Sequence, residues 1–68
     1  MDIRNLTTFI QVAELGNFTK AAGQLGYSQS TVSFQIRQLE EELNVSLFDR
    51  INHTVLLTEE GRQVLDYA

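Results

Sequence analysis

The hydrophobic residues in the first half of the chain recur at the spacing of helices that bury one face. The first run has hydrophobic side chains at i, i+3, i+4 and i+7, namely Leu6, Phe9, Ile10 and Ala13. This spacing predicts a helix over about residues 3–15. Gly16 then ends the run, because glycine readily leaves the helical conformation.

A second, shorter helix is predicted directly after Gly16. Asn17 is a good N-cap, and helical spacing relates the hydrophobic residues that follow it, which are Phe18, Ala21, Ala22 and Leu25. The two alanines allow a neighbouring helix to approach closely. Only Gly26 and its neighbours separate this helix from the next one, and so short a connection is typical of a helix-turn-helix.

The stretch from Gly26 to Leu43 predicts a third helix with two unlike faces. At about 100° per residue, its hydrophobic side chains fall within roughly 60° of one another and form a narrow stripe that must pack on a core. These side chains are Val32, Ile36, Leu39 and Leu43. Ser28 is the expected N-cap, and Asn44, which tolerates a left-handed backbone, is expected to end the helix.

The opposite face of this helix carries hydrogen-bonding, aromatic and cationic side chains. They are Gln29 at the edge of the face and Ser30, Ser33, Phe34 and Arg37 across it. No carboxylate lies among them, and the only charged residues between Leu15 and Leu39 are Lys20 and Arg37. Residues 40–42, all glutamate, follow directly and are expected to form a solvated part of the helix surface.

After Asn44 the hydrophobic period changes from that of a helix to that of a strand. Hydrophobic residues alternate with polar or mixed ones at Val45, Leu47, Val55 and Leu57. The segment between them, residues 49–54, contains Asn52 and His53, so the pattern predicts a two-stranded hairpin, or wing.

A last helix is predicted after the hairpin. Thr58 is a suitable cap, and Glu59 and Glu60 follow it in the first turn, where carboxylates meet the positive end of the helix dipole. The chain ends at Ala68 before this helix has an evident end. We therefore expect residues 58–68 to be the truncated start of a longer helix.

Composition limits the classes of function. With no cysteine and a single histidine, neither a disulfide framework nor a metal site is expected, and no cofactor. An enzyme is the least expected class, because there is no second histidine, no glycine-rich phosphate loop and no evident pair of buried carboxylates. No hydrophobic run approaches the roughly 20 residues that cross a bilayer, so we expect a cytoplasmic chain with no membrane partner.

The net charge of −4 runs against nucleic-acid binding at first sight, because such domains usually carry a basic surplus. The charges are unevenly placed, however. The cationic residues of the third helix and its surroundings are separate in sequence from the acidic residues of the last helix, and Arg50 and His53 add a second cationic point near the wing. The acidity can therefore face away from a polyanion.

Two stretches carry the most specific pattern in the chain. They are FTKAAGQLGYSQSTVSFQIRQLEEELNVSLFDR at residues 18–50 and VLLTEEG at residues 55–61. With the order of the elements, they resemble the N-terminal winged helix-turn-helix domain of LysR-type bacterial transcription regulators, over about Leu6 to Leu65. The chain departs from the family pattern at Ser30, often proline, at Phe34, often basic or an amide, and at Asn44, usually glycine.

The resemblance implies a mainly α fold: a winged helix-turn-helix of three helices plus a two-stranded wing over residues 1–57, then the start of a C-terminal linker helix over residues 58–68. The parent protein would carry an effector-binding domain, absent from this chain, and would form a homodimer or higher homo-oligomer. Two third helices would then enter successive major grooves about 34 Å apart. This chain alone is expected to be mainly monomeric and to bind DNA weakly.

The function implied is sequence-specific binding of double-stranded DNA by the third helix. A major groove about 12 Å wide admits one helix; in it Gln29 suits paired contact with adenine, and Phe34 can press on a thymine methyl group. The start of the second helix would hold phosphate, and the wing would lie near the backbone or the minor groove. The candidate DNA-binding residues are Thr19, Lys20, Ser28, Gln29, Ser30, Ser33, Phe34, Arg37, Arg50 and His53.

These candidates also have ordinary structural interpretations. Gln29 can be a solvated first-turn residue, the cations can be solvated charges, Arg50 can pair with Asp49, and His53 can be a turn residue. The alternative function is a protein-binding winged helix in which Phe34 anchors the partner. Affinity for DNA that falls steeply with salt would support the first function, and salt-insensitive binding to a protein the second.

Overall fold

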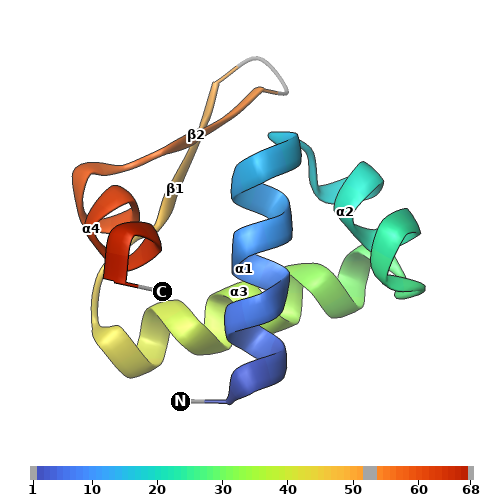
Figure 1. The fold of residues 1–68 in the computed structure, drawn as a ribbon, viewed down its shortest axis with the longest axis horizontal. Helices are drawn as coiled ribbons and strands as arrows, with labels where there is room; N and C mark the ends of the chain where they lie inside the picture. Colours follow the sequence, from blue (N-terminus) through green and yellow to red (C-terminus); the bar gives the residue numbers. More distant parts are fainter. Residues whose placement is uncertain (1, 52–53, 68) are drawn as a thin grey trace.

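The computed structural model describes residues 2–51 and 54–67, without the side chains of Arg50, Ile51 and Thr54. The elements in chain order are α1 (Ile3–Leu15), α2 (Phe18–Leu25), α3 (Gln29–Leu43), β1 (Phe48–Ile51), β2 (Thr54–Leu57) and α4 (Glu59–Tyr67). In Figure 1, α1 crosses α3, with α2 on one side and the hairpin and α4 on the other. The predicted mainly α, winged helix-turn-helix fold is confirmed. No helix of the described segments is long and hydrophobic enough to span a membrane.

The first three helices begin and end at residues suited to capping. Each N-cap has an extended backbone and a side chain that accepts a hydrogen bond from a first-turn amide, and the three are Asp2, Asn17 and Ser28. Each C-cap has a left-handed backbone, and the three are Gly16, Gly26 and Asn44. Asn44, with φ of 57°, therefore does what glycine usually does at this position of the family pattern.

The hydrophobic core lies where the first three helices meet the hairpin. Its buried side chains are Phe9, Val12, Phe18, Ala21, Ala22, Val32, Ile36, Leu39, Leu47 and Phe48. The ring of Phe48 in β1 lies 5.3 Å from the ring of Phe9 and 5.9 Å from the ring of Phe18, centroid to centroid. These tilted and edge-on contacts attach the hairpin to α1 and α2. The stripe predicted for α3 is buried, except that Leu43 packs at its margin.

The buried face of α1 is only partly the predicted one. Phe9 is fully buried, whereas its predicted companions Leu6, Ile10 and Ala13 pack against the margin of the core. Asn5 and Thr8 are buried instead, together with Val12. Hydrophobic spacing could not identify these two positions because their side chains are polar.

Asn5 and Thr8 join α1 to α3 through side-chain hydrogen bonds. Asn5 Nδ2 donates to Gln38 Oε1 at 3.0 Å, and Thr8 Oγ1 donates to Gln35 Oε1 at 2.6 Å. A buried polar group without a partner is costly, so both bonds favour one rotation of α3 about its own axis. That rotation decides which side chains of α3 face away from the core.

The hairpin is confirmed, but its strands are displaced from the predicted positions. β1 and β2 pair antiparallel, with Phe48 opposite Leu57 and Ile51 opposite Thr54. Val45 lies before the first strand, where its amide donates to the Glu40 carbonyl at the end of α3. Most of residues 49–54, the predicted turn, is strand, because backbone pairing continues through polar residues that interrupt the hydrophobic alternation.

The backbone of Leu47 connects α3, the hairpin and α4. Its amide donates to Glu40 Oε2 at 2.7 Å, and its carbonyl accepts from the Thr58 amide at 3.0 Å. The Thr58 hydroxyl accepts in turn from the Gly61 amide at 2.9 Å, so Thr58 caps α4 as predicted. The expectation that all of residues 40–42 are simply solvated is wrong for Glu40, which is partly buried and satisfies a backbone amide.

Gly61 lies against the same carbonyl. A Cβ at this position would stand 2.2 Å from the Leu47 carbonyl oxygen and 3.0 Å from Cδ2 of Leu57. The first contact is with backbone, which no side-chain rotation relieves. The close packing of α4 on the segment before β1 therefore requires glycine here.

We expect Gly61→Ala to lower the free energy of unfolding by about 1–3 kcal/mol, because relieving the overlap shifts the backbone. Gly23→Ala in α2 is the matched control: a Cβ there has no neighbour within 4 Å. Alanine favours a helix interior by about 0.5–1 kcal/mol, so this control should gain stability. Chemical denaturation of both variants measures the difference, and equal stabilities would contradict the requirement for glycine.

We expect Thr8→Val to lower the free energy of unfolding by about 1–2 kcal/mol, because Gln35 Oε1 loses its donor in a partly buried site. Thr7→Val is the matched control: Thr7 is exposed and, within the described part of the chain, its hydroxyl bonds only to the Ile3 carbonyl of its own helix. A change within about 0.5 kcal/mol is therefore expected. Thr8→Val combined with Gln35→Leu removes both partners and should recover part of the loss. Equal effects of the two single variants in thermal unfolding would refute this role of Thr8.

Candidate nucleic-acid interface

The open face of α3 is the side turned away from the core. The structure brings together all five side chains that the sequence places on this face. Four of them are exposed, Ser33 is partly buried, and together they line a shallow hollow of about 380 Å³: Gln29, Ser30, Ser33, Phe34 and Arg37. Hydroxyls, an amide, an aromatic ring and a guanidinium thus share one concave surface, which we call the α3 hollow.

Ser28 holds the first turn of α3 beside the α3 hollow. Its hydroxyl accepts from the Thr31 amide at 3.2 Å, and it lies 3.1 Å from the Ser30 hydroxyl and 2.9 Å from the Thr31 hydroxyl. The Ser28 side chain is therefore engaged in capping. It orders the neighbouring hydroxyls at the helix start.

Phe34 is the exposed aromatic side chain of this face. It is 60% exposed, whereas Phe9, Phe18 and Phe48 are buried and in contact within the core. No aromatic contact of Phe34 is found within the described residues. Most of this ring is therefore accessible to a partner.

Two cations lie at the surface near α3. Arg37 belongs to the α3 hollow, and Lys20 lies with Thr19 in the exposed first turn of α2, where the Lys20 amide donates to Asn17 Oδ1 at 2.9 Å. Within residues 2–51 and 54–67, no ion pair joins either cation to a carboxylate. Both charges are therefore available to an anionic partner.

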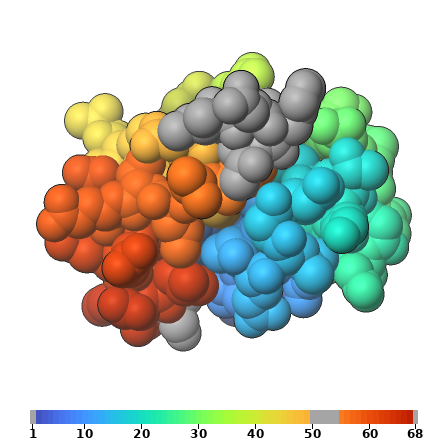
Figure 2. Space-filling view, turned by 90° about the horizontal axis from the view of Figure 1, so that it is seen from above, coloured from blue at the N-terminus to red at the C-terminus, as the bar shows by residue number. Residues whose placement is uncertain are grey.

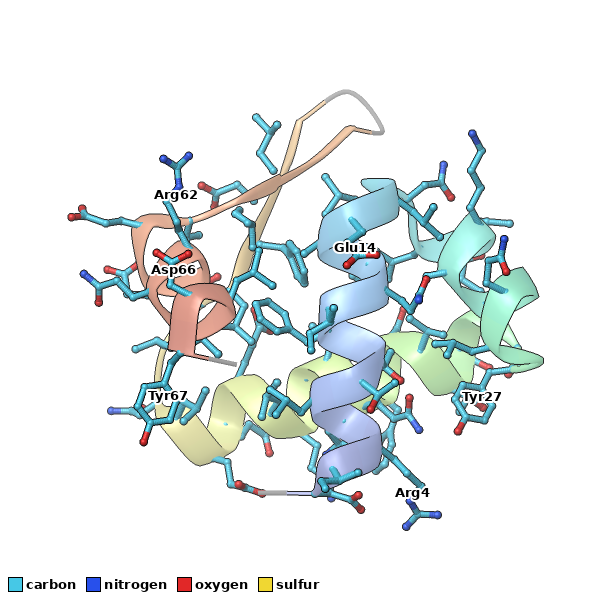
Figure 3. All side chains as sticks on the ribbon, in the orientation of Figure 1. Arg4, Glu14, Tyr27, Arg62, Asp66 and Tyr67 are labelled. Carbon is cyan, nitrogen blue, oxygen red and sulfur yellow. The ribbon has the colours of Figure 1, made fainter. Side chains whose placement is uncertain are left out.

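The acidic residues of α4 and the start of α1 lie away from the α3 hollow, whereas Glu40 and Glu41 of α3 line a neighbouring hollow together with Arg37. Viewed from above, α4 and α2 lie at opposite ends of the molecule (Figure 2). Asp66, with Arg62 and Tyr67, projects from α4 (Figure 3). Asp2 caps α1 and forms an ion pair with Arg4 at 3.2 Å, and the hydrogen bonds from Arg4 lower the pKa of Asp2. The acidic residues of α4 are thus remote from the cation of α2.

The wing candidates are only partly within the described part of the chain. Arg50 lies in β1 with its backbone opposite Val55. Its side chain, and all of His53, fall outside the described residues, so their roles stay predictions. Among the described residues, no group of three or more His, Cys, Asp or Glu is arranged to hold a metal ion.

Sequence reasoning missed the residues that orient the open face rather than those on it. Asn5, Thr8 and Glu40 each bond to a residue that helps to position α3. One signal was present in the sequence: Asn5 and Thr8 of α1 are three residues apart, and so are their partners Gln35 and Gln38 of α3. That match becomes informative only once the two helices are known to be in contact.

The sequence pattern of residues 3–62 matches the model of a family described as bacterial regulatory helix-turn-helix protein, lysR family. The chain belongs to the LysR family. The match covers α1, α2, α3, the wing and the first turn of α4.

LysR-family relatives extend well beyond this chain. The RuBisCO operon transcriptional regulator of Allochromatium vinosum is 46% identical over 68 residues, which are 100% of this chain and 22% of that protein. The HTH-type transcriptional regulator HdfR of Escherichia coli is also 46% identical over 68 residues, 100% of this chain and 24% of its own length. The chain thus spans less than a quarter of the length of these relatives.

Solved structures of LysR-family DNA-binding domains have the same fold. The crystal structure of the CbnR_DBD–DNA complex aligns with a TM-score of 0.94 and 39% identity, over 98% of this chain and 77% of that chain. The BenM_DBD/catB site 1 DNA complex aligns with a TM-score of 0.93 and 42% identity, over 98% of this chain and 75% of that chain. Both of those proteins were solved bound to DNA.

Proposed function

We propose that this chain binds double-stranded DNA sequence-specifically through α3 and serves as the DNA-binding domain of a bacterial transcription regulator. One observation carries the proposal: over 98% of its length the chain shares the fold of two domains solved with DNA, with TM-scores of 0.93 and 0.94. The α3 hollow offers the hydroxyl, amide and guanidinium groups that read base edges in a major groove.

The candidate residues divide into two groups by what they would contact. Base edges would be read from the α3 hollow by Gln29, Ser30, Ser33 and Phe34. Phosphates would be held by Thr19, Lys20, Arg50 and His53. Arg37 would reach either a phosphate or a guanine, and Ser28 fixes the first turn of α3. Phosphate contacts position the domain, and base contacts select the sequence.

This function needs neither a catalytic group nor a cofactor, and it operates in the cytoplasm, where the bacterial chromosome lies. A protein-binding module is the less favoured alternative, because the similar structures named above are DNA complexes. Salt dependence separates the two: DNA affinity should fall steeply between about 50 and 200 mM salt as bound counterions are released.

We also propose that residues 1–57 form the DNA-binding domain and that residues 58–68 begin the linker helix through which a longer protein dimerises. An effector-binding domain would belong to that longer protein. The chain spans under a quarter of the length of the two relatives named above, which leaves room for both features. Alone, the 68-residue chain should sediment mainly as a monomer; a tight dimer would disprove this assignment.

We expect Gln29→Ala to weaken binding to the preferred duplex by about 1–3 kcal/mol and to change binding to a scrambled duplex little, because an amide-to-base contact is lost. The preferred duplex is the one that the chain enriches from a randomised pool. Fluorescence anisotropy measures both affinities. Equal losses on the two duplexes would exclude base reading by Gln29.

Lys20→Ala is the control for the base-reading test. It should weaken binding to both duplexes alike. The slope of log affinity against log salt concentration should become shallower by about 1, the value for one lost phosphate contact. If the unsubstituted chain binds no duplex even at about 50 mM salt, the DNA-binding function itself fails for this chain.

A further inference from the structure

We propose that Phe34 reads the 5-methyl group of one thymine, with Ser30 accompanying it at the O4 of the same base. The α3 hollow would then distinguish a methylated pyrimidine from an unmethylated one at a single position of the binding site. This inference rests on the proposed function, because it requires α3 to lie in the major groove.

The first argument is the position of Phe34 outside the core. The chain has four phenylalanines; three are buried together, and Phe34 alone stands 60% exposed on α3. A benzyl side chain has no polar atom, so it can bond neither to phosphate nor to the polar edge of a base. The group that it can recognise in a major groove is the thymine methyl group, the hydrophobic feature among the base edges.

The second argument is what stands beside the ring. Ser30 precedes Phe34 by four residues and Arg37 follows it by three, so both are its neighbours on the helix surface. The structure places all three in the wall of the α3 hollow. The ring is therefore flanked by a hydroxyl on one side and a guanidinium on the other.

The Ser30 hydroxyl is suited to the second group that thymine presents. It lies 3.1 Å from the Ser28 hydroxyl, and either oxygen can be the donor of that bond. When Ser28 donates, the Ser30 proton is free to point out of the helix toward an acceptor. Thymine presents both a methyl group and the O4 acceptor in the major groove, whereas cytosine presents an amino donor and no methyl group.

The third argument selects DNA over a protein as the partner of the ring. The α3 hollow has no carboxylate in its wall and includes Arg37, which has no ion-pair partner among the described residues. Lys20 on α2 is a second cation that has no ion-pair partner among the described residues. An exposed ring set among hydroxyls and cations fits the anionic, hydrogen-bonding surface of a duplex.

Base analogues test the inference without changing the rest of the duplex. In the preferred duplex, each thymine is replaced singly by deoxyuridine, which removes the methyl group and keeps O4. We expect one thymine per bound domain at which this replacement weakens binding about fourfold. This is the change in affinity expected when one buried methyl-sized group is lost. When that thymine is replaced by a cytosine, the chain should bind the duplex with 5-methylcytosine more tightly than the duplex with unmethylated cytosine.

Phe34→Ala is then measured on the same duplexes. It should bind the thymine and deoxyuridine duplexes with equal affinity, so that the methyl effect disappears in a double-mutant cycle. Phe34→Leu should keep part of the effect. Tyr67→Ala on α4, which removes a ring that is 95% exposed, is the control and should keep all of it.

The possible outcomes separate this inference from the proposed function. If duplex binding is salt-dependent but no thymine is sensitive to loss of its methyl group, the methyl inference is overturned and DNA binding stands. A methyl effect that survives in Phe34→Ala also overturns it, because another residue then reads the methyl group. If the chain binds a protein through Phe34 and binds no duplex, both the methyl inference and the proposed DNA-binding function are overturned.

Discussion

The fold depends on one backbone position, Leu47. Its side chain is fully buried in the core, its amide donates to the carboxylate of Glu40 at the end of α3, and its carbonyl accepts from the amide of Thr58 at the start of α4. Gly61 packs on the same carbonyl. Three successive elements are therefore tied to one residue, and the directions of α3 and α4 cannot change independently while these bonds are kept.

The opposite side of α3 is held by different interactions. Thr8 and Asn5 bond to Gln35 and Gln38 and fix the rotation of the helix, and the Ser28 cap fixes its first turn. α3 is thus constrained in tilt at its C-terminal end, in rotation along its middle and in conformation at its start. A recognition helix needs all three constraints, because a small rotation would replace the side chains that it presents to a groove.

Local interactions explain what the sequence predicts well. Helix bounds follow from caps and from hydrophobic spacing, and both are set by residues within four positions of each other, as at Asn17 and Ser28. The sequence predicts poorly what depends on which elements meet. The bonds of Thr8 to Gln35 and of Glu40 to Leu47 join different segments, and the pairing of β1 runs through polar residues. The open face of α3 was predictable because it is simply the side opposite the hydrophobic stripe.

The open face of α3 has little part in holding the fold together. Within the described residues, the side chains of Gln29, Phe34 and Arg37 make no hydrogen bond or ion pair with the rest of the chain. Exposed substitutions of this kind usually change stability by less than about 0.5 kcal/mol. Such a surface can accept new residues one at a time while the scaffold stays intact. Different residues therefore determine the stability of the fold and the DNA sequence that it prefers. A scaffold of this design can evolve toward new binding sites without first being stabilised.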